Sequence, residues 1–426
     1  MNKKNEFEWK KSYYNIEIEV DKGILLYNIL SKGFVLLDEK EYIEFYKNEN
    51  LWDKNEKMLE EFTSNGFIVK GNDRETFLKN FDEIENVNKK YLGITFVPTQ
   101  LCNFNCSYCF ERSKKYDMEE SIFKKSIEFI KEIIDSKNEL ENISVLFFGG
   151  EPLIKLDMVL KFGEVIKNIS KEKKLNFSSS IITNGYYLNY DTAKALCEIC
   201  NLKFVQITLD GDRNFHNKRR NNSYEILMNN LEKIKEFKDL KISIRIQVDK
   251  ENIFSIKNLL NDLKKFDEDK NISFYFSSIL GEFEENPDKR NIHFDEKEFG
   301  KILTENIIPL IFEIGFNNFE LYPQPHAGGC GFVSENSFII DADGRLKECL
   351  ELVGEEESCG NIFDKKINKK LSNLKFKLPD FCVYCKFLPL CNGSCPLRRS
   401  KGIIKCSFWK YSLKDYLKKI YEFKFK

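Results

Sequence analysis

Short apolar runs alternate with longer amphipathic segments between residue 93 and about residue 280. The apolar runs are GITFVP, ISVLFFG, FSSSIIT, FVQITLD, ISIRIQVD and ISFYFSS. The segments between them, such as EESIFKKSIEFIKEIID and DMVLKFGEVIKNISKE, place apolar residues at helical spacing. This alternation predicts parallel strands joined by right-handed crossovers. Six such units predict an α/β fold with a partial (β/α)6 TIM-type barrel, in which the chemistry lies at the C-terminal ends of the strands.

The pattern differs on both sides of this region. Residues 1–92 contain strand-like runs (IEIEV, ILLYNIL, FVLLD, FIVK) and two helical segments (DEKEYIEFYKN, DKNEKMLEEFTSNG), which predict a winged-helix-like α+β module. A structural extension without a function of its own is the alternative. The predicted barrel domain spans 93–290 and ends in a connector-like stretch, GEFEENPDK, at 281–289. Residues 291–325 continue as a connector and a bridging helix, EKEFGKILTENIIPLIFEIG. Residues 326–426 are rich in cysteine and show little periodicity, so bound metal clusters would have to hold this domain together.

Composition narrows the class of protein. The 426 residues carry a net charge of −1, which provides no field toward nucleic acid or an anionic membrane. Neither a secretory signal nor an apolar run of about 18 residues is present, so we expect a cytoplasmic protein. In a reducing compartment, 13 cysteines are expected to bind metal rather than to form disulfides.

Three of these cysteines follow the first predicted barrel strand in LCNFNCSYCF, at Cys102, Cys106 and Cys109. Three thiolates on one loop can hold three irons of a 4Fe–4S cluster and leave the fourth iron open. Zinc is the alternative, but it requires a fourth ligand nearby, and none is obvious.

Five motifs in order resemble the radical S-adenosylmethionine (radical SAM) superfamily. They are CxxxCxxC at 102–109, FFGGEP at 147–152, ITNG at 182–185, ITLDGDRNFHNKRR at 207–220 and IRIQVDKEN at 244–252. Thr208, Asn217 and Gln247 depart from the residues usual in these motifs. The resemblance implies that S-adenosylmethionine (SAM) ligates the open iron and is cleaved reductively to a 5′-deoxyadenosyl radical, which abstracts hydrogen from the substrate. The protein orients the cofactor and excludes water.

The resemblance also places candidate SAM contacts at the strand ends. These residues are Tyr108, Gly149, Gly150, Glu151, Asn184, Thr208, Arg220 and Arg245. Gly149 and Gly150 allow a close backbone approach, although a glycine turn before Pro152 would explain them equally well. Either arginine matches the methionine carboxylate in bidentate fashion, and a salt bridge is the alternative for each.

The remaining cysteine clusters resemble a SPASM domain. Cys330, Gly344 and Cys349 form the motif C-x13-G-x4-C. The motif C-x2-C-x5-C-x3-C begins at Cys382 and ends at Cys395, and Cys406 follows it. The resemblance implies two auxiliary 4Fe–4S clusters, hence three clusters in all. The implied ligands are Cys382, Cys385, Cys391 and Cys406 for the distal cluster, and Cys330, Cys349 and Cys395 for the proximal one. Cys359 is a fourth proximal ligand, a free thiol or a catalytic group, and a pair of zinc sites is the alternative for the whole set.

Radical SAM/SPASM proteins mostly modify peptides, and two branches compete. Anaerobic sulfatase-maturing enzymes form formylglycine and carry an Asp directly after the second SPASM cysteine, where this chain has Leu350. The other branch matures ribosomally made peptides and often begins with a module that holds the leader peptide as an added strand. We therefore expect a peptide maturase that works anaerobically with flavodoxin or ferredoxin as reductant and forms thioethers in a Cys-rich precursor. A small-metabolite or cofactor-precursor enzyme, or a non-catalytic Fe–S carrier or metal-scaffolded binding protein, remains open.

Overall fold

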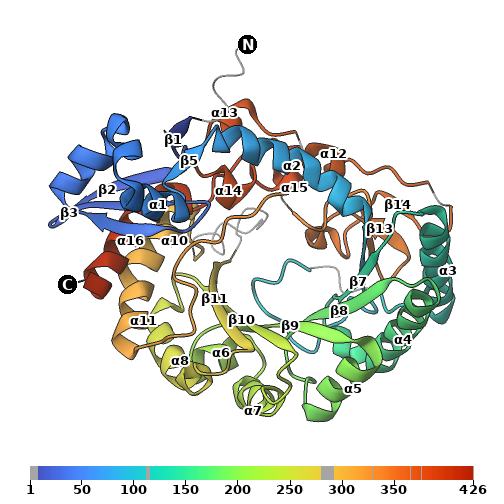
Figure 1. Ribbon diagram of the computed structural model, residues 1–426. Coiled ribbons are helices and arrows are strands. Elements are labelled where there is room, and N and C mark those ends of the chain that lie inside the picture. Colours follow the sequence, from blue (N-terminus) through green and yellow to red (C-terminus); the bar gives the residue numbers. More distant parts are fainter. Residues whose placement is uncertain are drawn as a thin grey trace.

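One curved sheet of nine strands forms the centre of the molecule (Figure 1). The computed structural model describes residues 8–111, 116–279, 292–328, 330–364, 366–375 and 377–425. The strand order in the large sheet is β11-β10-β9-β8-β7-β6-β12-β13-β14. Its first six strands are mutually parallel, which confirms the predicted (β/α)6 arrangement.

The barrel elements follow the predicted alternation closely. The strands are Tyr91–Phe96 (β6), Asn142–Phe147 (β7), Asn176–Thr183 (β8), Leu202–Leu209 (β9), Lys241–Val248 (β10) and Ile272–Ser278 (β11). The helices and short turns between them are Glu120–Ser136 (α3), Pro152–Lys155 (η4), Leu156–Glu172 (α4), Tyr190–Cys200 (α5), Arg213–Arg219 (α6), Tyr224–Ile234 (α7), Ile253–Ser255 (η5), Ile256–Leu263 (α8) and Lys264–Phe266 (η6). Helices α3 to α8 cover the convex face of the sheet (Figure 1).

The two faces of the barrel strands differ in polarity. In β10, Ile242, Ile244 and Ile246 are fully buried in the main apolar core, whereas the alternate residues Ser243 and Arg245 are polar. Because successive side chains of a strand point to opposite faces, the polar set lies on the concave face. The concave face of β10 is therefore polar, unlike the aliphatic core of a closed TIM barrel.

The C-terminal region adds strands to this sheet, which the sequence pattern did not predict. Ser337–Ile340 (β12) pairs in parallel with β6, and Arg345–Lys347 (β13) and Gly360–Asn361 (β14) follow antiparallel. These strands have two to four residues, too few to show a period in the sequence. Gly344 adopts φ 84° in the β12–β13 turn, where its N–H donates to the Asp341 carbonyl at 2.9 Å. A left-handed turn thus explains the glycine between Cys330 and Cys349.

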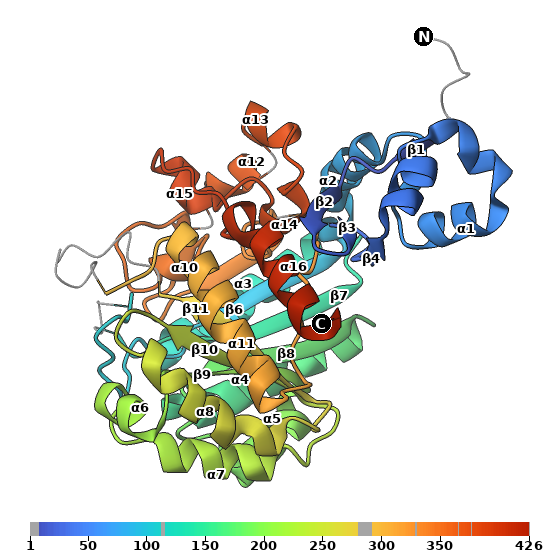
Figure 2. The same ribbon diagram turned by 90° about the vertical axis from the view of Figure 1, so that its left-hand side faces the viewer.

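The remaining C-terminal elements are short, except for the last helix. They are Leu350–Leu352 (η8), Leu371–Lys375 (α12), Asp380–Val383 (α13), Leu388–Cys391 (α14), Pro396–Ser400 (α15) and Trp409–Phe425 (α16). Helix α16 runs beside Glu296–Ile302 (α10) and Ile308–Ile314 (α11), as Figure 2 shows. Between α10 and α11 lies a π-helical turn, Leu303–Ile307 (η7), just before Pro309, which has no N–H to donate to the helix ladder. The predicted connector GEFEENPDK lies outside the described residues.

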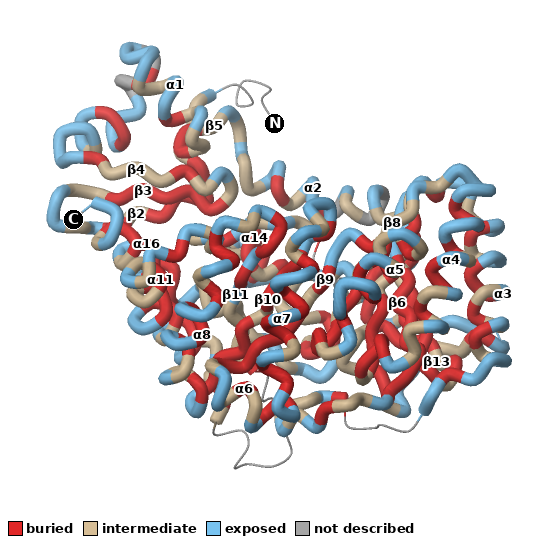
Figure 3. Tube along the Cα trace, turned by 90° about the horizontal axis from the view of Figure 1, so that it is seen from below, coloured by how far each residue is buried: buried red, intermediate tan, exposed pale blue. Residues whose placement is uncertain are grey.

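The N-terminal module has two small sheets. Asn15–Val20 (β2), Gly23–Asn28 (β3) and Phe34–Leu37 (β4) form a meander, and Trp9–Lys11 (β1) pairs with Ile68–Lys70 (β5). Glu41–Tyr46 (η2), Glu49–Lys54 (η3) and Glu56–Ser64 (α1) pack on them, and Asp73–Lys89 (α2) leads into β6. Helix α2, which the sequence analysis did not single out, crosses to the barrel beside the C-terminal region (Figure 1). The buried positions are concentrated in the barrel (Figure 3), and no helix of the described residues is long and apolar enough to cross a membrane.

Candidate active site

The three cysteines after β6 come together at the C-terminal end of the sheet. The Cys109 N–H donates to the Cys106 carbonyl at 3.1 Å, and the Phe104 N–H points to Cys102 Sγ at 3.4 Å. Burial raises the pKa of the Cys109 thiol to about 11, and Glu111, Cys106 and Cys102 add to the shift. The thiols therefore lie within electrostatic reach of one another, and a metal cluster would have to displace their protons.

The two glycines after β7 are required by the chain that leads into this cysteine loop. A Cβ on Gly149 would lie 2.3 Å from the Thr99 carbonyl oxygen, and a Cβ on Gly150 would lie 2.3 Å from that of Leu101. Gly150 N–H donates to Thr99 at 3.2 Å, and Glu151 N–H donates to Leu101 at 2.9 Å. The glycines thus let the strand end pack against the backbone that precedes Cys102. Their contact with a ligand stays a prediction.

Glu151 is a fully buried carboxylate that joins the ends of β7 and β8. It accepts hydrogen bonds from Leu153 N–H (3.0 Å), the Thr183 hydroxyl (2.8 Å) and Asn184 N–H (2.8 Å). Burial raises its pKa to about 7, although these hydrogen bonds and Arg220 act in the opposite direction. A carboxylate has about four acceptor positions, so one remains for a further donor such as an ammonium group.

Asn184 and Thr208, two of the candidate SAM contacts, lie at the C-terminal ends of β8 and β9. The Asn184 amide donates to Asn103 Oδ1 at 2.7 Å, within the loop, and lies 3.8 Å from Cys102 Sγ. Thr208 is buried and pairs in register with Arg245 on the neighbouring strand. Both residues therefore stand at the predicted end of the sheet.

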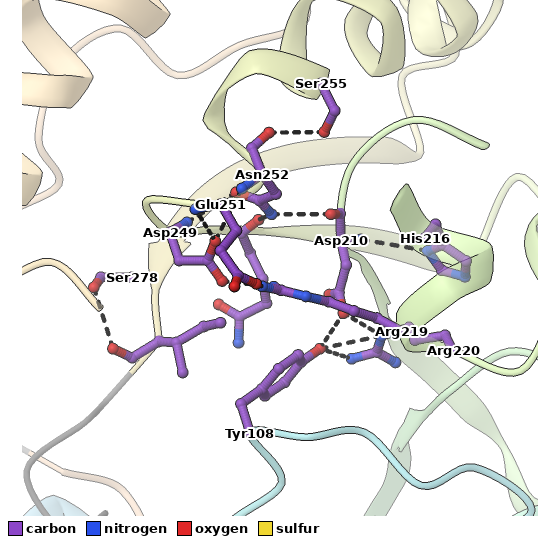
Figure 4. A network of polar contacts seen from close by, with 12 residues as sticks. Tyr108, Asp210, His216, Arg219, Arg220, Asp249, Glu251, Asn252, Ser255 and Ser278 are labelled. Atoms are coloured by element: carbon purple, nitrogen blue, oxygen red, sulfur yellow. Dashed lines mark hydrogen bonds and ion pairs between the residues drawn. The ribbon is translucent and has the colours of Figure 1, made fainter. Parts of the chain in front are cut away.

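Tyr108 belongs to a buried ionic network that the motifs did not reveal (Figure 4). Its hydroxyl donates to Asp210 Oδ2 at 2.5 Å, and Arg220 Nε donates to the same oxygen at 2.9 Å. Arg220 Nε also reaches the Tyr108 hydroxyl at 3.1 Å. Burial raises the pKa of Tyr108 well above its usual value, so the phenol stays protonated. The network ties the cysteine loop to the end of β9.

Asp210 retains an acceptor in this network. Its Oδ1 is buried and has no hydrogen-bond partner among the described residues. An unpaired buried oxygen carries a desolvation cost of about 1–3 kcal/mol, which a ligand hydroxyl or ammonium group would relieve. Asp210 is part of the ITLDG motif, which by itself did not indicate a role for this carboxylate. Its place directly after a barrel strand was the available signal.

A second ionic layer supports the first. Arg219 donates to Asp249 at 2.5 Å and to Glu251 at 2.7 Å, and Asn252 donates to the Asp210 carbonyl at 2.9 Å (Figure 4). These residues come from α6 and from the loop after β10. They brace the Asp210 loop, and the Arg219 guanidinium also lies 5.8 Å from the centre of the Tyr108 ring.

His216 is a neutral structural group in this layer. Its Nδ1 accepts the Asp210 N–H at 3.3 Å, and its Nε2 lies 3.0 Å from the Ser223 hydroxyl. Ser223 itself donates to the Arg220 carbonyl at 2.6 Å, so Nε2 carries the ring proton. Burial and, to a smaller extent, the charge of Arg220 lower the pKa of His216 to about 3, against an opposing effect of Asp210. The imidazole therefore positions the chain and does not exchange protons near neutral pH.

The two candidate arginines differ in how fully they are engaged. Arg220 is held by Asp210 and Tyr108, as described above. Arg245 donates to the Ser277 hydroxyl at 3.0 Å, but its buried Nε has no partner among the described residues. Arg245 therefore retains a donor for a carboxylate, and Arg220 retains less capacity.

The C-terminal thiols form two groups. Cys330, Cys349 and Cys395 pack around Val333, Leu352, Leu371 and Leu397. Burial, followed by the neighbouring thiols of Cys391, Cys385 and Cys406, raises the pKa of Cys382 to about 11, so these three thiols lie within electrostatic reach of Cys382. The grouping corresponds to the two ligand sets that the SPASM resemblance implies.

Cys359 stands apart from both groups. It is buried in the main apolar core, and its thiol donates to the Leu346 carbonyl at 3.3 Å. Burial, with a smaller contribution from the charge of Glu348, raises its pKa to about 11, and Lys369 acts in the opposite direction. The structure thus favours a packed, protonated thiol over a ligand or a nucleophile.

The donor sets fit the implied groups. Three soft thiols at the strand ends suit iron–sulfur ligation, and Glu151, Asp210 and Arg245 offer an acceptor or a donor to an amino acid head group. Among the described residues, no three His, Cys, Asp or Glu side chains are arranged as ligands of a single metal ion.

Comparisons with known proteins agree with this geometry. Residues 96–263 match the family model of the radical SAM superfamily. The chain contains a radical SAM domain. A cysteine-type anaerobic sulfatase-maturating enzyme of Clostridium perfringens is 25% identical over 328 residues, which cover 69% of this chain and 85% of that protein. The radical SAM cyclopropyl synthase TigE of Paramaledivibacter caminithermalis is 28% identical over 200 residues, covering 42% of this chain and 41% of that one.

A solved structure shares the fold. The anSMEcpe structure with bound AdoMet and Kp18Cys peptide superposes with a TM-score of 0.61 at 24% identity, covering 78% of this chain and 97% of that one. The family match and the two relatives make the chain a relative of sulfatase maturases and radical SAM peptide modifiers, and the radical SAM family supports SAM and a 4Fe–4S cluster as its cofactors.

Proposed function

We propose that this radical SAM enzyme matures a ribosomally made peptide, which the N-terminal module recognises through its leader, and forms thioether crosslinks in a Cys-rich precursor. Cys102, Cys106 and Cys109 hold the SAM-binding cluster, and the two C-terminal thiol groups hold auxiliary clusters in a SPASM domain. Bound SAM supplies the radical that removes hydrogen from the peptide. Glu151, Asp210 and Arg245 orient it.

The observation that carries the proposal is an edge strand on a module that is docked beside the C-terminal cysteines. Strand β4 pairs with β3 on one side and with no other strand of the described residues. The Tyr13 hydroxyl donates to the Tyr384 carbonyl at 2.5 Å, and Lys386 donates to the Asn15 carbonyl at 3.0 Å. An extended leader added to β4 would gain main-chain hydrogen bonds at a fixed place relative to the barrel.

The sulfatase-maturase alternative is favoured by the Clostridium perfringens relative but not by the residues near Cys349. Leu350 occupies the position of the expected catalytic Asp. Glu348 accepts from the N–H groups of Lys370 and Leu371 at 2.8 and 3.0 Å, which anchors the start of α12. Glu351 lies 3.6 Å from Arg398. Both flanking carboxylates are therefore engaged elsewhere.

Two measurements test the proposal. Reconstituted, reduced protein is incubated with SAM under anaerobic conditions, and 5′-deoxyadenosine is measured. Its absence would support the non-catalytic Fe–S carrier. Co-expression with a neighbouring Cys-rich reading frame should then give a peptide that loses two hydrogens per crosslink and resists thiol alkylation. Replacement of a peptide cysteine by formylglycine would instead identify a sulfatase-type maturase, and an unmodified peptide would contradict thioether formation.

Two proline variants test the role of β4 and control for each other. Successive N–H groups of a strand point to opposite neighbours. Val35→Pro and Leu36→Pro therefore differ in the N–H that they remove. One variant removes an N–H that points to β3, and the other, the edge variant, removes an N–H that points away from β3 at the unpaired edge of β4. The edge variant should keep uncoupled SAM cleavage and the thermal midpoint but lose peptide modification. Full modification by both folded variants would contradict leader binding at β4.

A further inference from the structure

Three fully buried polar side chains connect the first cysteine loop with the hairpin that leads to Cys349. Gln100 lies two residues before Cys102, and Lys347 lies two residues before Cys349. Asp341 follows β12 directly and lies between them. All three have no exposed surface. We call this set the Gln100–Asp341–Lys347 bridge.

Asp341 is the centre of the bridge. Its Oδ1 accepts the Gln100 amide at 2.8 Å and the Ala342 N–H at 2.8 Å, and its Oδ2 accepts the Gly354 N–H at 2.8 Å. Because β12 runs parallel to β6, Asp341 stands at the C-terminal end of the sheet, the same end as the active site. Its contact with Gln100 spans 241 residues of sequence.

Lys347 completes the bridge from β13. Its ammonium lies 3.9 Å from Asp341 Oδ2 and donates to the carbonyls of Glu355 and Glu357, the latter at 2.8 Å. The charge of Asp341 is therefore compensated without solvent. The bridge thus ties β13, and with it the start of the Cys349 loop, to the segment that enters the Cys102 loop.

The cost of burying these charged side chains indicates that the bridge does more than stabilise the folded protein. Burying a charged pair costs several kcal/mol per ion in desolvation, and apolar residues of similar size commonly stabilise a core as well or better. Directional hydrogen bonds, in contrast, fix the relative position of the segments they join. The two segments joined here each enter a loop of cysteines.

We propose that Asp341 is a positioning residue that fixes the Cys102 loop against the Cys349 loop through Gln100 and Lys347, and so sets the relative placement of the two cluster sites. The inference rests on the proposed function, because it takes Cys349 as a ligand of an auxiliary cluster. It gives the β12–β13 hairpin a role in SAM cleavage although none of its side chains is among the candidate cofactor contacts.

Two variants of the reconstituted holoprotein test this role. Asp341→Asn places an amide against N–H donors and leaves Lys347 without its counter-charge. Gln100→Leu removes the link to the Cys102 loop but leaves the ion pair intact. Asp267→Asn is the matched control, since Asp267 is a buried carboxylate that accepts the Asn317 N–H at 2.8 Å and lies 2.6 Å from Lys264, outside the site.

The readouts are the electron paramagnetic resonance spectrum of the reduced clusters with and without SAM, the rate of 5′-deoxyadenosine formation and the thermal midpoint. A displacement of about 1 Å costs up to about 100-fold in rate, so both bridge variants should slow SAM cleavage at least tenfold and alter the SAM-dependent spectral change. Asp267→Asn should lower only the thermal midpoint.

Bridge variants with wild-type spectra and cleavage rates but lower thermal midpoints would overturn the proposal, because they would show a structural role alone. If Asp341→Asn does not fold, Gln100→Leu decides. Failure of the proposed function looks different, because the wild-type protein would then lack auxiliary-cluster signals or leave every peptide unmodified, while the spectrum of the SAM-binding cluster remains measurable.

Discussion

Gly150→Ala tests whether the second glycine of FFGGEP serves the packing of the cysteine loop. The added Cβ would lie 2.3 Å from the Leu101 carbonyl oxygen and 2.5 Å from that of Gln100, whereas real Cβ contacts are essentially never under 3.0 Å and rarely under 3.4 Å. The Cys102 loop must therefore move by roughly 0.7–1.1 Å, the difference between these distances. Both obstructing atoms belong to the backbone, so no side chain can rotate away.

Gly150→Ala is expected to reduce the rate of SAM cleavage more than the stability of the folded protein. Overpacking of this kind costs about 1–3 kcal/mol, which a domain stable by about 5–15 kcal/mol tolerates. A shift of about 1 Å in the loop proposed to hold the SAM-binding cluster should slow SAM cleavage by up to about 100-fold. The assay is 5′-deoxyadenosine formation per iron bound, measured anaerobically with the thermal midpoint of the same sample.

Gly315→Ala is the control. Gly315 ends α11 with φ 67°, and its added Cβ would meet no atom within 4 Å. This change should cost about 1 kcal/mol through backbone strain and leave SAM cleavage unchanged. A Gly150→Ala protein that cleaves SAM within threefold of the wild-type rate would refute the packing argument.

Four further outcomes are expected. Asp210→Asn removes the negative charge that compensates the buried Arg220 guanidinium and should lower the free energy of unfolding by about 3–5 kcal/mol, measured as a lower thermal midpoint. An unchanged midpoint would mean that the Asp210–Arg220 pair is solvated. Arg245→Met should weaken SAM binding at least tenfold in equilibrium dialysis with little change in thermal midpoint, and unaltered affinity would assign this arginine to another partner. Burial raises the pKa of Glu151 to about 7 from an ordinary value of 4.5, so its protonated form stabilises the fold by about 3 kcal/mol below pH 4.5, and this stability is lost as the pH rises through 7. As the pH is raised from about 5 to about 8, the thermal midpoint of the wild-type protein should therefore decrease relative to that of Glu151→Gln. Parallel curves for the two proteins would contradict the pKa shift. Cys359→Ala should keep the full iron content per protein, whereas a loss of iron would make Cys359 a ligand.

Local signals along the chain predicted much of this protein. The strand–helix alternation is a periodic property of neighbouring residues, so it located β6 to β11 within a few residues. The spacing of Cys102, Cys106 and Cys109 on one loop is equally local, and so is the spacing of the C-terminal cysteines. The sequence by itself therefore determined the barrel, and it predicted the cofactor class and, through the SPASM resemblance, the grouping of the cysteines.

The tertiary structure alone decided which distant segments meet. β12 is too short to show a period, yet its pairing with β6 places Asp341 beside Gln100. The sequence could not choose between Arg220 and Arg245, because their difference depends on which carboxylate or hydroxyl each one contacts across strands. Cys359 likewise became a packed core thiol only when β13 and β14 were in place. The spacing of residues along the chain shows which side chains can act together within one loop. The burial of a side chain and its contacts with another loop arise only in the folded protein, where the parallel strands bring their C-terminal ends together at one edge of the sheet.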